Sequence, residues 1–298
     1  MELDQIISFL KPLEVIGNRS RPIKRVIQFD PSNQDPDIIC WINEKNLAKA
    51  SSLSQGVLIC PVSLNKEALN TNCTYLLIDN PRQAFQRLLA HFFVKKPLQG
   101  IISPSAIIGQ NVSIGKNTSI GHHTVIEDNC IIGDNVVIMH NNAILENTVI
   151  HSNVTIGSNN TIGGIGFGYE KNEEGHYELM PHIGNVVIEE FVEVGNNTCI
   201  DRAVLGSTLL KKHCKIDNLV HIAHGVIVGE NSLVIAHAII GGSSVIGKNV
   251  WVAPNASVIN KVSIGDNSTI GLAAVVVKDV EANTVVVGNP AKPLIKNK

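Results

Sequence analysis

The sequence predicts a mainly β protein, in which a parallel β-helix of hexapeptide repeats follows a small N-terminal α/β domain. The first observation is a period of six, because an isoleucine stands at every sixth position from Ile108 to Ile162. A short, fixed period indicates a solenoid, since each repeat can bury its aliphatic side chain only by stacking on its neighbours. The second is that aromatic residues make up 4% of the chain while hydrophobic residues make up 44%, so the core must consist of aliphatic side chains in narrow strands. The third is that residues 1–98 lack the repeat.

Residues 1–98 have the pattern of a small α/β domain. Strands are expected at residues 24–29, 38–42, 57–60 and 75–78, and helices at residues 6–10 and 43–53. A further helix should begin at Asp79-Asn80-Pro81, because a polar cap followed by proline in the first turn is a typical helix start. Residues 97–104 are predicted to link this domain to the repeat.

The repeat occupies residues 102–288, and a short tail, residues 289–298, follows it. Its phase is interrupted by an insertion at residues 163–187, slips by four residues near Gly206 and then continues to Val276. Each hexad supplies a short strand and a turn, and three hexads make one triangular coil. Coils stack about 4.8 Å apart, as parallel strands do, so residues three hexads apart lie one above the other. The insertion is long for a loop with no structure of its own, and such loops are usually functional.

Composition and charge argue against several functions. The formal net charge is -2, and no basic stripe indicates binding to nucleic acid. No apolar run approaches the ~18 residues that span a bilayer, and we expect no secretory signal because residues 1–5 lack a positive start. The six cysteines show no paired metal-binding spacing, so we expect reduced thiols in a cytoplasmic protein with no bound metal or cofactor.

His224 is the candidate general base, since an imidazole can take a proton from an attacking amine near neutral pH. The coil spacing places Gly242 directly above it, followed by Asn260 and Lys278. Attack of an amine on a thioester forms an oxyanion, which a backbone N–H must stabilise. Glycine at position 242 would let the reacting carbonyl approach that N–H without meeting a β-carbon.

The base also needs an acceptor for its second ring nitrogen. Asp217, one hexad earlier and near a corner, is the first choice for this carboxylate, and Asp201 is the second. His122 and His123 are expected to be solvated turn residues. His237 lies on a different face of the same chain and could approach the site only from a neighbouring chain.

Four stretches carry a family resemblance: Gly166-Phe167-Gly168-Tyr169, Pro181-His182-Ile183-Gly184, residues 192–202 and residues 216–224. They closely resemble UDP-3-O-acylglucosamine N-acyltransferase, a family of left-handed β-helix enzymes that adds an acyl chain to the amine of a UDP-sugar in lipid A synthesis. The resemblance implies a left-handed parallel β-helix and a homotrimer with its sites in the grooves between chains. The insertion is then expected to project over a neighbour's groove.

The resemblance also implies roles for single residues. His224 corresponds to the catalytic base of the family, Asp217 to its carboxylate partner and Gly242 to its oxyanion donor. Trp41 looks like the aromatic residue that stacks on uridine in the family's nucleotide-binding N-terminal domain. The remaining residues expected to bind the UDP-linked amino sugar are Phe167, Gly168, Tyr169 and Asn218.

The chain departs from the family pattern in three places. Ile165 stands where the family has an acidic residue, and residues 257–262 lack the family's second histidine. The tail from Ala273 to Pro293 is similar to that of CoA-dependent sugar acetyltransferases of the same fold, rather than to helices that engage an acyl-carrier protein. These departures favour a short acyl-CoA as the donor.

The expected reaction is therefore transfer of an acyl group from acyl-CoA, with acetyl-CoA favoured, to the amine of a UDP-linked amino sugar for lipopolysaccharide or cell-surface polysaccharide synthesis. The pantetheine of CoA is expected to lie along Gly242, Asn260 and Lys278. The alternative is the lipid A UDP-3-O-acylglucosamine N-acyltransferase itself, with a hydroxyacyl-carrier protein as donor. Two remote alternatives are a zinc enzyme of the γ-carbonic anhydrase kind, which needs three histidines at a subunit boundary, and a non-catalytic scaffold.

Overall fold

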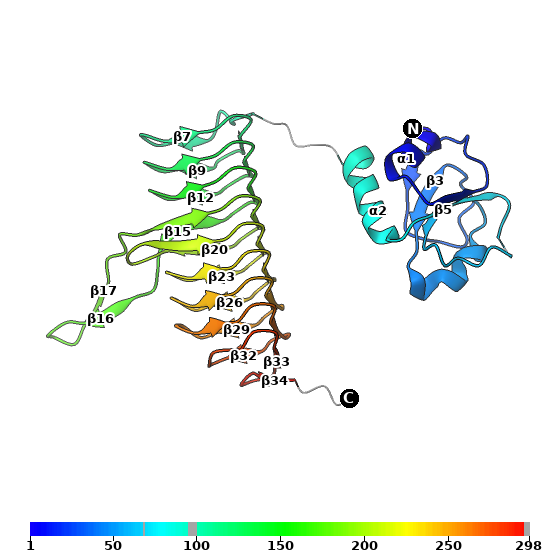
Figure 1. Cartoon of the computed structure of the whole chain (residues 1–298). Coiled ribbons are helices and arrows are strands. Elements are labelled where there is room, and N and C mark those ends of the chain that lie inside the picture. The colour runs from blue at the N-terminus through cyan, green and yellow to red at the C-terminus, as the bar shows by residue number, and fades with distance from the viewer. Residues whose placement is uncertain (68, 95–99, 295–298) are drawn as a thin grey trace. The chain divides into compact units, whose positions relative to one another are not determined.

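The computed structural model describes residues 1–67, 69–94 and 100–294. They form two compact units, Met1–Lys96 and Pro97–Lys298 (Figure 1). Residues 97–99 of the expected linker and residues 295–298 of the expected tail lie outside the described residues. No helix in the described part of the chain is long and apolar enough to cross a bilayer.

The first unit is an α/β sandwich. Its described residues form a sheet in the order β1 (Glu14–Ile16), β5 (Cys73–Leu77), β4 (Gly56–Cys60), β3 (Ile38–Trp41) and β2 (Arg25–Val26), parallel except for β1. Its helical segments are α1 (Leu3–Leu10), the 3₁₀ helix η1 (Glu44–Ser52), α2 (Pro81–Leu88) and the π-helical turn η2 (Leu89–Phe93).

The two faces of this sheet bury different helices because side chains alternate along a strand. On one face, Ile39 packs in a cluster with Leu3 of α1 and Leu88 of α2. On the other face, Ile38 packs in a cluster with Ala50 of η1. Trp41 ends β3 on the α2 side and is partly exposed.

Most elements of this unit follow the sequence prediction, with three differences. The helix predicted after Asp79 is α2, and the Asn80 side chain caps it by accepting the Gln83 N–H at 3.1 Å. The segment predicted as a helix at residues 43–53 forms the 3₁₀ helix η1 rather than an α-helix, and η1 itself buries only Ala50. The strand predicted at residues 24–29 shortens to β2 at the edge of the sheet, and the partly exposed β1 was not predicted.

The second unit is a left-handed parallel β-helix with three sheets along its described length. The β23 sheet contains β6 (Ile107–Ile108), β9 (Val125–Ile126), β12 (Ala143–Ile144), β15 (Thr161–Ile165), β20 (Cys199–Arg202), β23 (His221–Ile222), β26 (Ile239–Ile240), β29 (Ser257–Val258) and β32 (Val275–Val276). The β24 sheet contains β7 (Ser113–Ile114), β10 (Ile131–Ile132), β13 (Val149–Ile150), β18 (Asn185–Ile188), β21 (Ser207–Leu210), β24 (Ile227–Val228), β27 (Val245–Ile246) and β30 (Ser263–Ile264). The β22 sheet contains β8 (Ser119–Ile120), β11 (Val137–Ile138), β14 (Thr155–Ile156), β19 (Glu193–Val194), β22 (Lys215–Ile216), β25 (Leu233–Val234), β28 (Trp251–Val252), β31 (Thr269–Ile270), β33 (Val285–Val287) and the antiparallel β34 (Lys292–Pro293).

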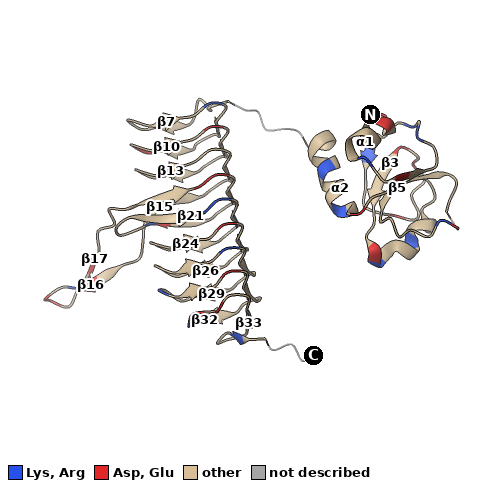
Figure 2. Ribbon diagram, in the orientation of Figure 1, with Lys and Arg blue, Asp and Glu red and all other residues tan. Residues whose placement is uncertain are grey.

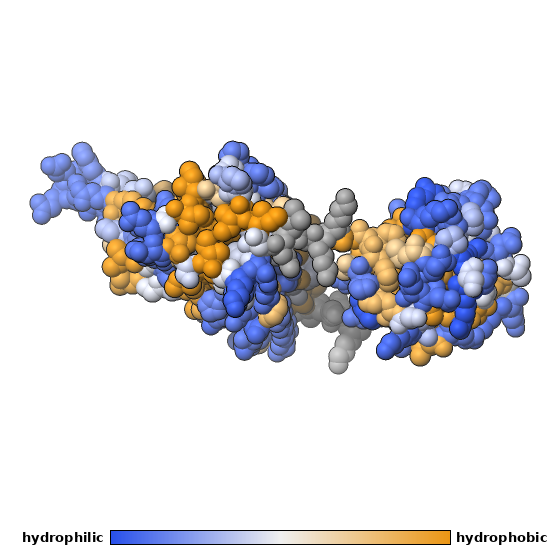
Figure 3. Space-filling view, turned by 90° about the horizontal axis from the view of Figure 1, so that it is seen from above, coloured by the Kyte–Doolittle hydropathy of each residue, from blue (hydrophilic) through white to orange (hydrophobic). Residues whose placement is uncertain are grey.

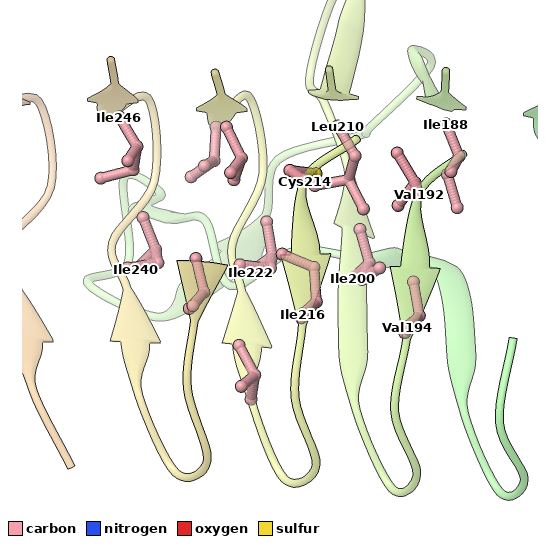
Figure 4. Packing of buried hydrophobic residues seen from close by; sticks show 14 of the residues in the cluster. Ile188, Val192, Val194, Ile200, Leu210, Cys214, Ile216, Ile222, Ile240 and Ile246 are labelled. Carbon is pink, nitrogen blue, oxygen red and sulfur yellow. The ribbon is translucent and has the colours of Figure 1, made fainter. Parts of the chain in front are cut away.

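The pairing register follows the predicted coil of three hexads. Ile132 pairs with Ile150, 18 positions later. The insertion lengthens the offset from Ile162 to its partner Ile200, and the four-residue slip lengthens the next offset, from Ile200 to Ile222. The inward side chain of each hexad joins one continuous aliphatic core, part of which is seen in Figure 4.

The corners of the coil explain the frequent asparagines. Each corner contains a residue with a left-handed backbone, such as Asn129 at φ 59° and Asn147 at φ 62°. Asparagine tolerates this conformation better than most residues, and its amide can also bond along the stack. The side chain of Asn111, for example, donates to that of Asn129 one coil above at 3.3 Å. Charged residues lie mainly at corners and loops (Figure 2).

The insertion has a structure of its own, which corrects the expectation of an unstructured loop. It contains the hairpin β16 (Tyr169–Lys171) and β17 (Tyr177–Leu179), which projects from the β-helix (Figure 1). Arg202 anchors its start: the buried guanidinium donates to the Gly163 carbonyl at 2.6 Å and to Glu146 at 2.7 Å.

Apolar side chains also reach the surface of this unit. Figure 3 shows hydrophobic residues gathered at the end of the β-helix that faces the viewer. The exposed large apolar residues of the first coil are Ile101, Ile102, Ile107 and Ile108. All six cysteines lie in the described part of the chain and are free thiols, and Cys199 alone among them is exposed.

Candidate functional site

His224 lies at the corner that follows β23, with its ring half-buried. Gly242 occupies the same corner one coil above, as the repeat predicts, because Ile222 pairs with Ile240. A β-carbon added to residue 242 would stand 2.7 Å from Nε2 of His224. Real β-carbons do not approach so closely, so only glycine leaves room for this ring nitrogen.

At several corners of the β-helix a side chain of the next coil caps the backbone N–H, but among the described residues the Gly242 N–H has no such cap. At equivalent corners, Asp128 accepts from Gln110 at 2.6 Å, and Asp266 accepts from Lys248 at 2.8 Å. A free backbone donor therefore stands directly above a potential base, which is the arrangement that stabilises an oxyanion during acyl transfer.

A second imidazole reaches this corner from the insertion. The rings of His182 and His224 meet edge to face, with centroids 5.3 Å apart and planes at 79°. Gly166 lies between them, because a β-carbon there would stand 2.9 Å from both rings. The Met180 carbonyl accepts a hydrogen bond from Nδ1 of His182 at 2.7 Å, which fixes that ring.

The electrostatics favour the neutral form of His224. Burial lowers the pKa of His224, and the neighbouring His182 and His221 lower it further. Burial raises the pKa of Asp201, while His221 and His182 act in the opposite direction. The Asp201 carboxylate lies 3.6 Å from Nε2 of His221, so this acid is paired with His221. A neutral imidazole with a low pKa has the free lone pair that a general base needs.

A cavity of about 760 Å³ opens beside His224 and has a mainly apolar lining. The hairpin and the segment before it line one side, and the corner one coil above Gly242 lines the other. The lining residues are Phe167, Gly168, Tyr169, Glu170, Tyr177, Met180, His224, Asn260 and Lys261. The sequence prediction included Phe167, Gly168, Tyr169 and Asn260 among these, and the structure brings them together with the base.

Two predicted residues do not reach His224 within one chain. Asp217 lies at the corner after β22, where its carboxylate accepts the N–H groups of Asn218 at 2.8 Å and Ala236 at 3.1 Å. Asn218 is part of the same corner stack and accepts the Asn196 N–H at 2.7 Å. The expected pairing of Asp217 with the base is therefore wrong for a single chain, because a step of one hexad moves a residue to the next corner of the triangle.

Lys278 lies two coils above Gly242, as the spacing predicts, and is exposed. The cavity wall in the described structure contains Lys261 and not Lys278. Lys261 follows Asn260 at the corner, so it was within reach of the same spacing argument. Tyr177, Met180 and His182 were missed as site residues because the insertion interrupts the repeat and has no period of its own.

The first unit has a pocket of its own around Trp41. This cavity, of about 700 Å³, is lined by aromatic, amide and cationic side chains that include Trp41, Phe85, Asn43, Asn46 and Lys49. The rings of Trp41 and Phe85 lie 6.1 Å apart and are tilted by 32°. An exposed aromatic face beside two side-chain amides suits a flat heterocycle that has hydrogen-bonding edges.

Metal ligands are not grouped in the described part of the chain, where no set of three or more His, Cys, Asp or Glu side chains could hold an ion. His221 and His224, which the zinc alternative would need, flank the inward Ile222. Their described neighbours are Asp201 and His182 respectively.

Comparison with known proteins shows the family of the chain. Residues 105–140, 129–164 and 243–276 match the family model "Bacterial transferase hexapeptide (six repeats)". UDP-3-O-acylglucosamine N-acyltransferase of Campylobacter lari is 46% identical over 258 residues, which are 83% of this chain and 80% of that protein. The enzyme of the same name from Wolinella succinogenes is 42% identical over 125 residues, 42% of this chain and 39% of that protein.

Solved structures support the same fold. UDP-N-acetylglucosamine acyltransferase of Francisella novicida superimposes with a TM-score of 0.59 at 23% identity, over 65% of this chain and 70% of that chain. UDP-N-acetylglucosamine O-acyltransferase of Moraxella catarrhalis has a TM-score of 0.57 at 26% identity, over 65% of this chain and 73% of that chain. With the repeat, the fold and the extended match to the C. lari protein, the chain is an acyltransferase and belongs to the UDP-3-O-acylglucosamine N-acyltransferase family.

Proposed function

We propose that the protein transfers a long acyl chain from a carrier-protein thioester to the amine of UDP-3-O-acylglucosamine, with His224 as general base. The observation that carries this proposal is the free N–H of Gly242 directly above Nε2 of His224, whose ring lines an apolar cavity. The name shared by its relatives supplies the acceptor.

The proposed step needs no group beyond those at this corner. The amine lone pair of the sugar attacks the thioester carbonyl carbon and forms a C–N bond, while the carbonyl π electrons move onto oxygen. The Gly242 N–H stabilises that oxyanion, and Nε2 of His224 takes one proton from the nitrogen. As the carbonyl reforms, the C–S bond breaks and the proton passes from His224 to the departing thiolate.

The cavity favours a long acyl chain over the acetyl group that the sequence favours. Its lining includes Phe167, Tyr177 and Met180, whose apolar surfaces an acetyl group would leave largely unused. Burial of apolar surface contributes about 0.8 kcal/mol per CH₂ group, so each methylene of the acyl chain that packs against this wall should strengthen donor binding. The short acyl-CoA prediction therefore becomes the second candidate, supported by Ile165, by the missing histidine in residues 257–262 and by the tail similar to that of CoA-dependent enzymes.

The pocket around Trp41 is proposed to bind the uracil ring. Trp41 supplies the stacking face, and the amides of Asn43 and Asn46 can pair with the donor and acceptor edges of a pyrimidine. Lys49 provides a positive charge in the same pocket for the neighbouring phosphates.

A homotrimer is also proposed. Exposed apolar side chains on the outer faces of the β-helix, among them Ile239 at 48% and Trp251 at 47%, support contact with further copies. The hairpin has such residues as well, with Tyr177 at 69%. Size-exclusion chromatography with light scattering would test this, and a monomer at micromolar concentration would contradict it.

The reaction is tested by offering purified protein UDP-3-O-acylglucosamine with either a 3-hydroxyacyl-carrier protein or acetyl-CoA. Mass spectrometry of the nucleotide sugar reports N-acylation, and the free thiol reports turnover. The proposal expects a kcat/KM at least tenfold higher with the carrier protein. Preference for acetyl-CoA would restore the short-chain candidate, and failure of both donors would overturn the assignment of the acceptor.

A further inference from the structure

His182 is held in place at the base although it belongs to the insertion. It is 7% exposed and lies in the turn between β17 and β18. The Met180 carbonyl accepts a hydrogen bond from its Nδ1 at 2.7 Å, so Nδ1 bears the proton of the neutral ring and Nε2 has the lone pair. The backbone thus fixes both the tautomer and the orientation of this imidazole.

Nε2 of His182 is an anomaly in this core. It is buried and has no hydrogen-bond partner in the described structure. Buried polar atoms are almost always paired, because leaving one unpaired costs stability. Because the unpaired Nε2 costs stability, a role at the neighbouring base explains His182 better than a contribution to folding does.

The contact between the two rings depends on glycine. A β-carbon on Gly166 would stand 2.9 Å from Nε2 of His182 and 2.9 Å from Cδ2 of His224. With glycine there, the rings meet edge to face at 5.3 Å. Because Asp217 is occupied at another corner, no carboxylate among the described residues hydrogen-bonds the His224 ring. In the described structure that ring packs edge to face against His182, and Gly166 and Gly242 approach it closely.

We infer that His182 is a positioning residue, which holds the His224 ring beneath Gly242 and, by its proximity, disfavours a positive charge on that ring. This inference rests on the proposed function of His224 as the base. A positive charge on His224 would stand beside the His182 ring, 5.3 Å away between centroids in a partly buried site, and His182 lowers the pKa of His224. A neutral base is thereby kept available at lower pH.

The other groups around His224 do not replace this role. His221 of β23 also lowers the pKa of His224, but its Nε2 lies 3.6 Å from the carboxylate of Asp201 of β20. Glu170 of the hairpin and Lys261 of the corner above line the cavity with opposite charges. His182 has no carboxylate within salt-bridge distance in the described residues.

The test is a pair of substitutions read by NMR. His182→Phe retains a ring of similar size but cannot be charged, and His182→Ala removes the ring. The Cε1–H resonances of the full-length protein labelled in its histidine rings are titrated against pH and assigned to His224 by their loss in His224→Ala. Because His182 lowers the pKa of His224, we expect the His224 midpoint to move to higher pH in both variants. His176→Phe, in the exposed hairpin turn of the same insertion, is the control and should leave the midpoint unchanged.

The second measurement is the pH dependence of acyl-transfer activity in the two variants. The acid limb of kcat/KM should move to higher pH in His182→Phe, and kcat in His182→Ala should fall by about 10²-fold at every pH because the base is misplaced. The inference would be overturned if the titration midpoint of His224 did not move in either variant. It would also be overturned if both variants lost kcat equally and the acid limb of kcat/KM did not shift. If His182→Phe does not fold, His182→Gln takes its place, and failure of both to fold would make the ring purely structural. If the wild-type protein transfers no acyl group, the proposed function fails while the titration still decides the coupling.

Discussion

Nε2 of His224 lies directly beneath Gly242, 2.7 Å from the point where a β-carbon on residue 242 would stand. Gly242→Ala should therefore push the imidazole away from the oxyanion position and lower kcat by about 10²-fold, as expected for a base displaced by about 1 Å. Steady-state kinetics would measure this. Gly164→Ala is the control, since its β-carbon would meet only ordinary contacts at 3.5 Å and 3.6 Å. Full activity in Gly242→Ala would remove this corner from the mechanism.

Removal of the imidazole itself should have a larger effect. His224→Ala is expected to lower kcat by about 10²–10⁴-fold, the usual contribution of a general base, with little change in KM. His123→Ala provides a control, because His123 is also a corner histidine of the β-helix but is exposed and lies outside the cavity lining. Equal turnover by His224→Ala and wild-type enzyme in thiol-release assays would show that another group takes the proton.

The pH profile should reflect the environment of His224. Burial and the neighbouring His182 and His221 lower the pKa of His224, so less of it is protonated at a given acidic pH. The base must be neutral to accept a proton, and activity is lost as pH falls through its pKa. The acid limb of kcat/KM should therefore have its midpoint below the ordinary imidazole value of about 6.5. A midpoint above that value would mean that a different group limits the rate.

Trp41 should contribute to binding rather than to chemistry. Stacking on a base contributes about 1–3 kcal/mol, so Trp41→Ala is expected to raise KM for the UDP-sugar about 5- to 150-fold and leave kcat nearly unchanged. Trp41→Phe should recover part of the loss. Lys45 of η1 is exposed and does not line this pocket, so Lys45→Ala is the control and should leave this KM unchanged. Unaltered KM in Trp41→Ala would place the nucleoside elsewhere.

Arg202 should matter for stability, because it fixes the start of the insertion. Its side chain is 7% exposed and donates to the Gly163 carbonyl and to Glu146. Arg202→Met should lower the free energy of unfolding by about 1.5–3 kcal/mol, the range for hydrogen bonds to charged groups. Urea unfolding followed by circular dichroism would measure it. Lys215→Met, which breaks the exposed pair with Glu193, should cost less than about 1 kcal/mol. Equal effects would contradict the anchoring role.

The repeat made the β-helix predictable in detail, since each isoleucine of the six-residue period is an inward side chain and three hexads close one coil. The same spacing placed Gly242 over His224 correctly. The spacing did not correctly place Asp217 beside His224 in one chain. The two residues are close in sequence, but one hexad separates them, so they lie at different corners of the coil. The spacing gave no prediction for His182, because an insertion outside the repeat has no register. Only the folded hairpin shows that the end of the insertion lies against His224.

The donor could not be read from the sequence for a related reason. The cavity wall combines the hairpin residues Tyr177 and Met180 with a corner of the coil, and no local pattern links those segments. The sequence signal in the tail favoured acetyl-CoA, whereas the assembled wall favours a longer chain. A tail motif is weaker evidence than the surface that an acyl group would contact.

The most direct test of the central claim is the rate of N-acylation of UDP-3-O-acylglucosamine by a 3-hydroxyacyl-carrier protein, measured by mass spectrometry with wild-type enzyme and with His224→Ala. The expected result is N-acylated sugar that forms in step with free thiol and about 10²–10⁴-fold more slowly in the variant. Absence of the product with wild-type enzyme, or an unchanged rate in His224→Ala, would contradict the account.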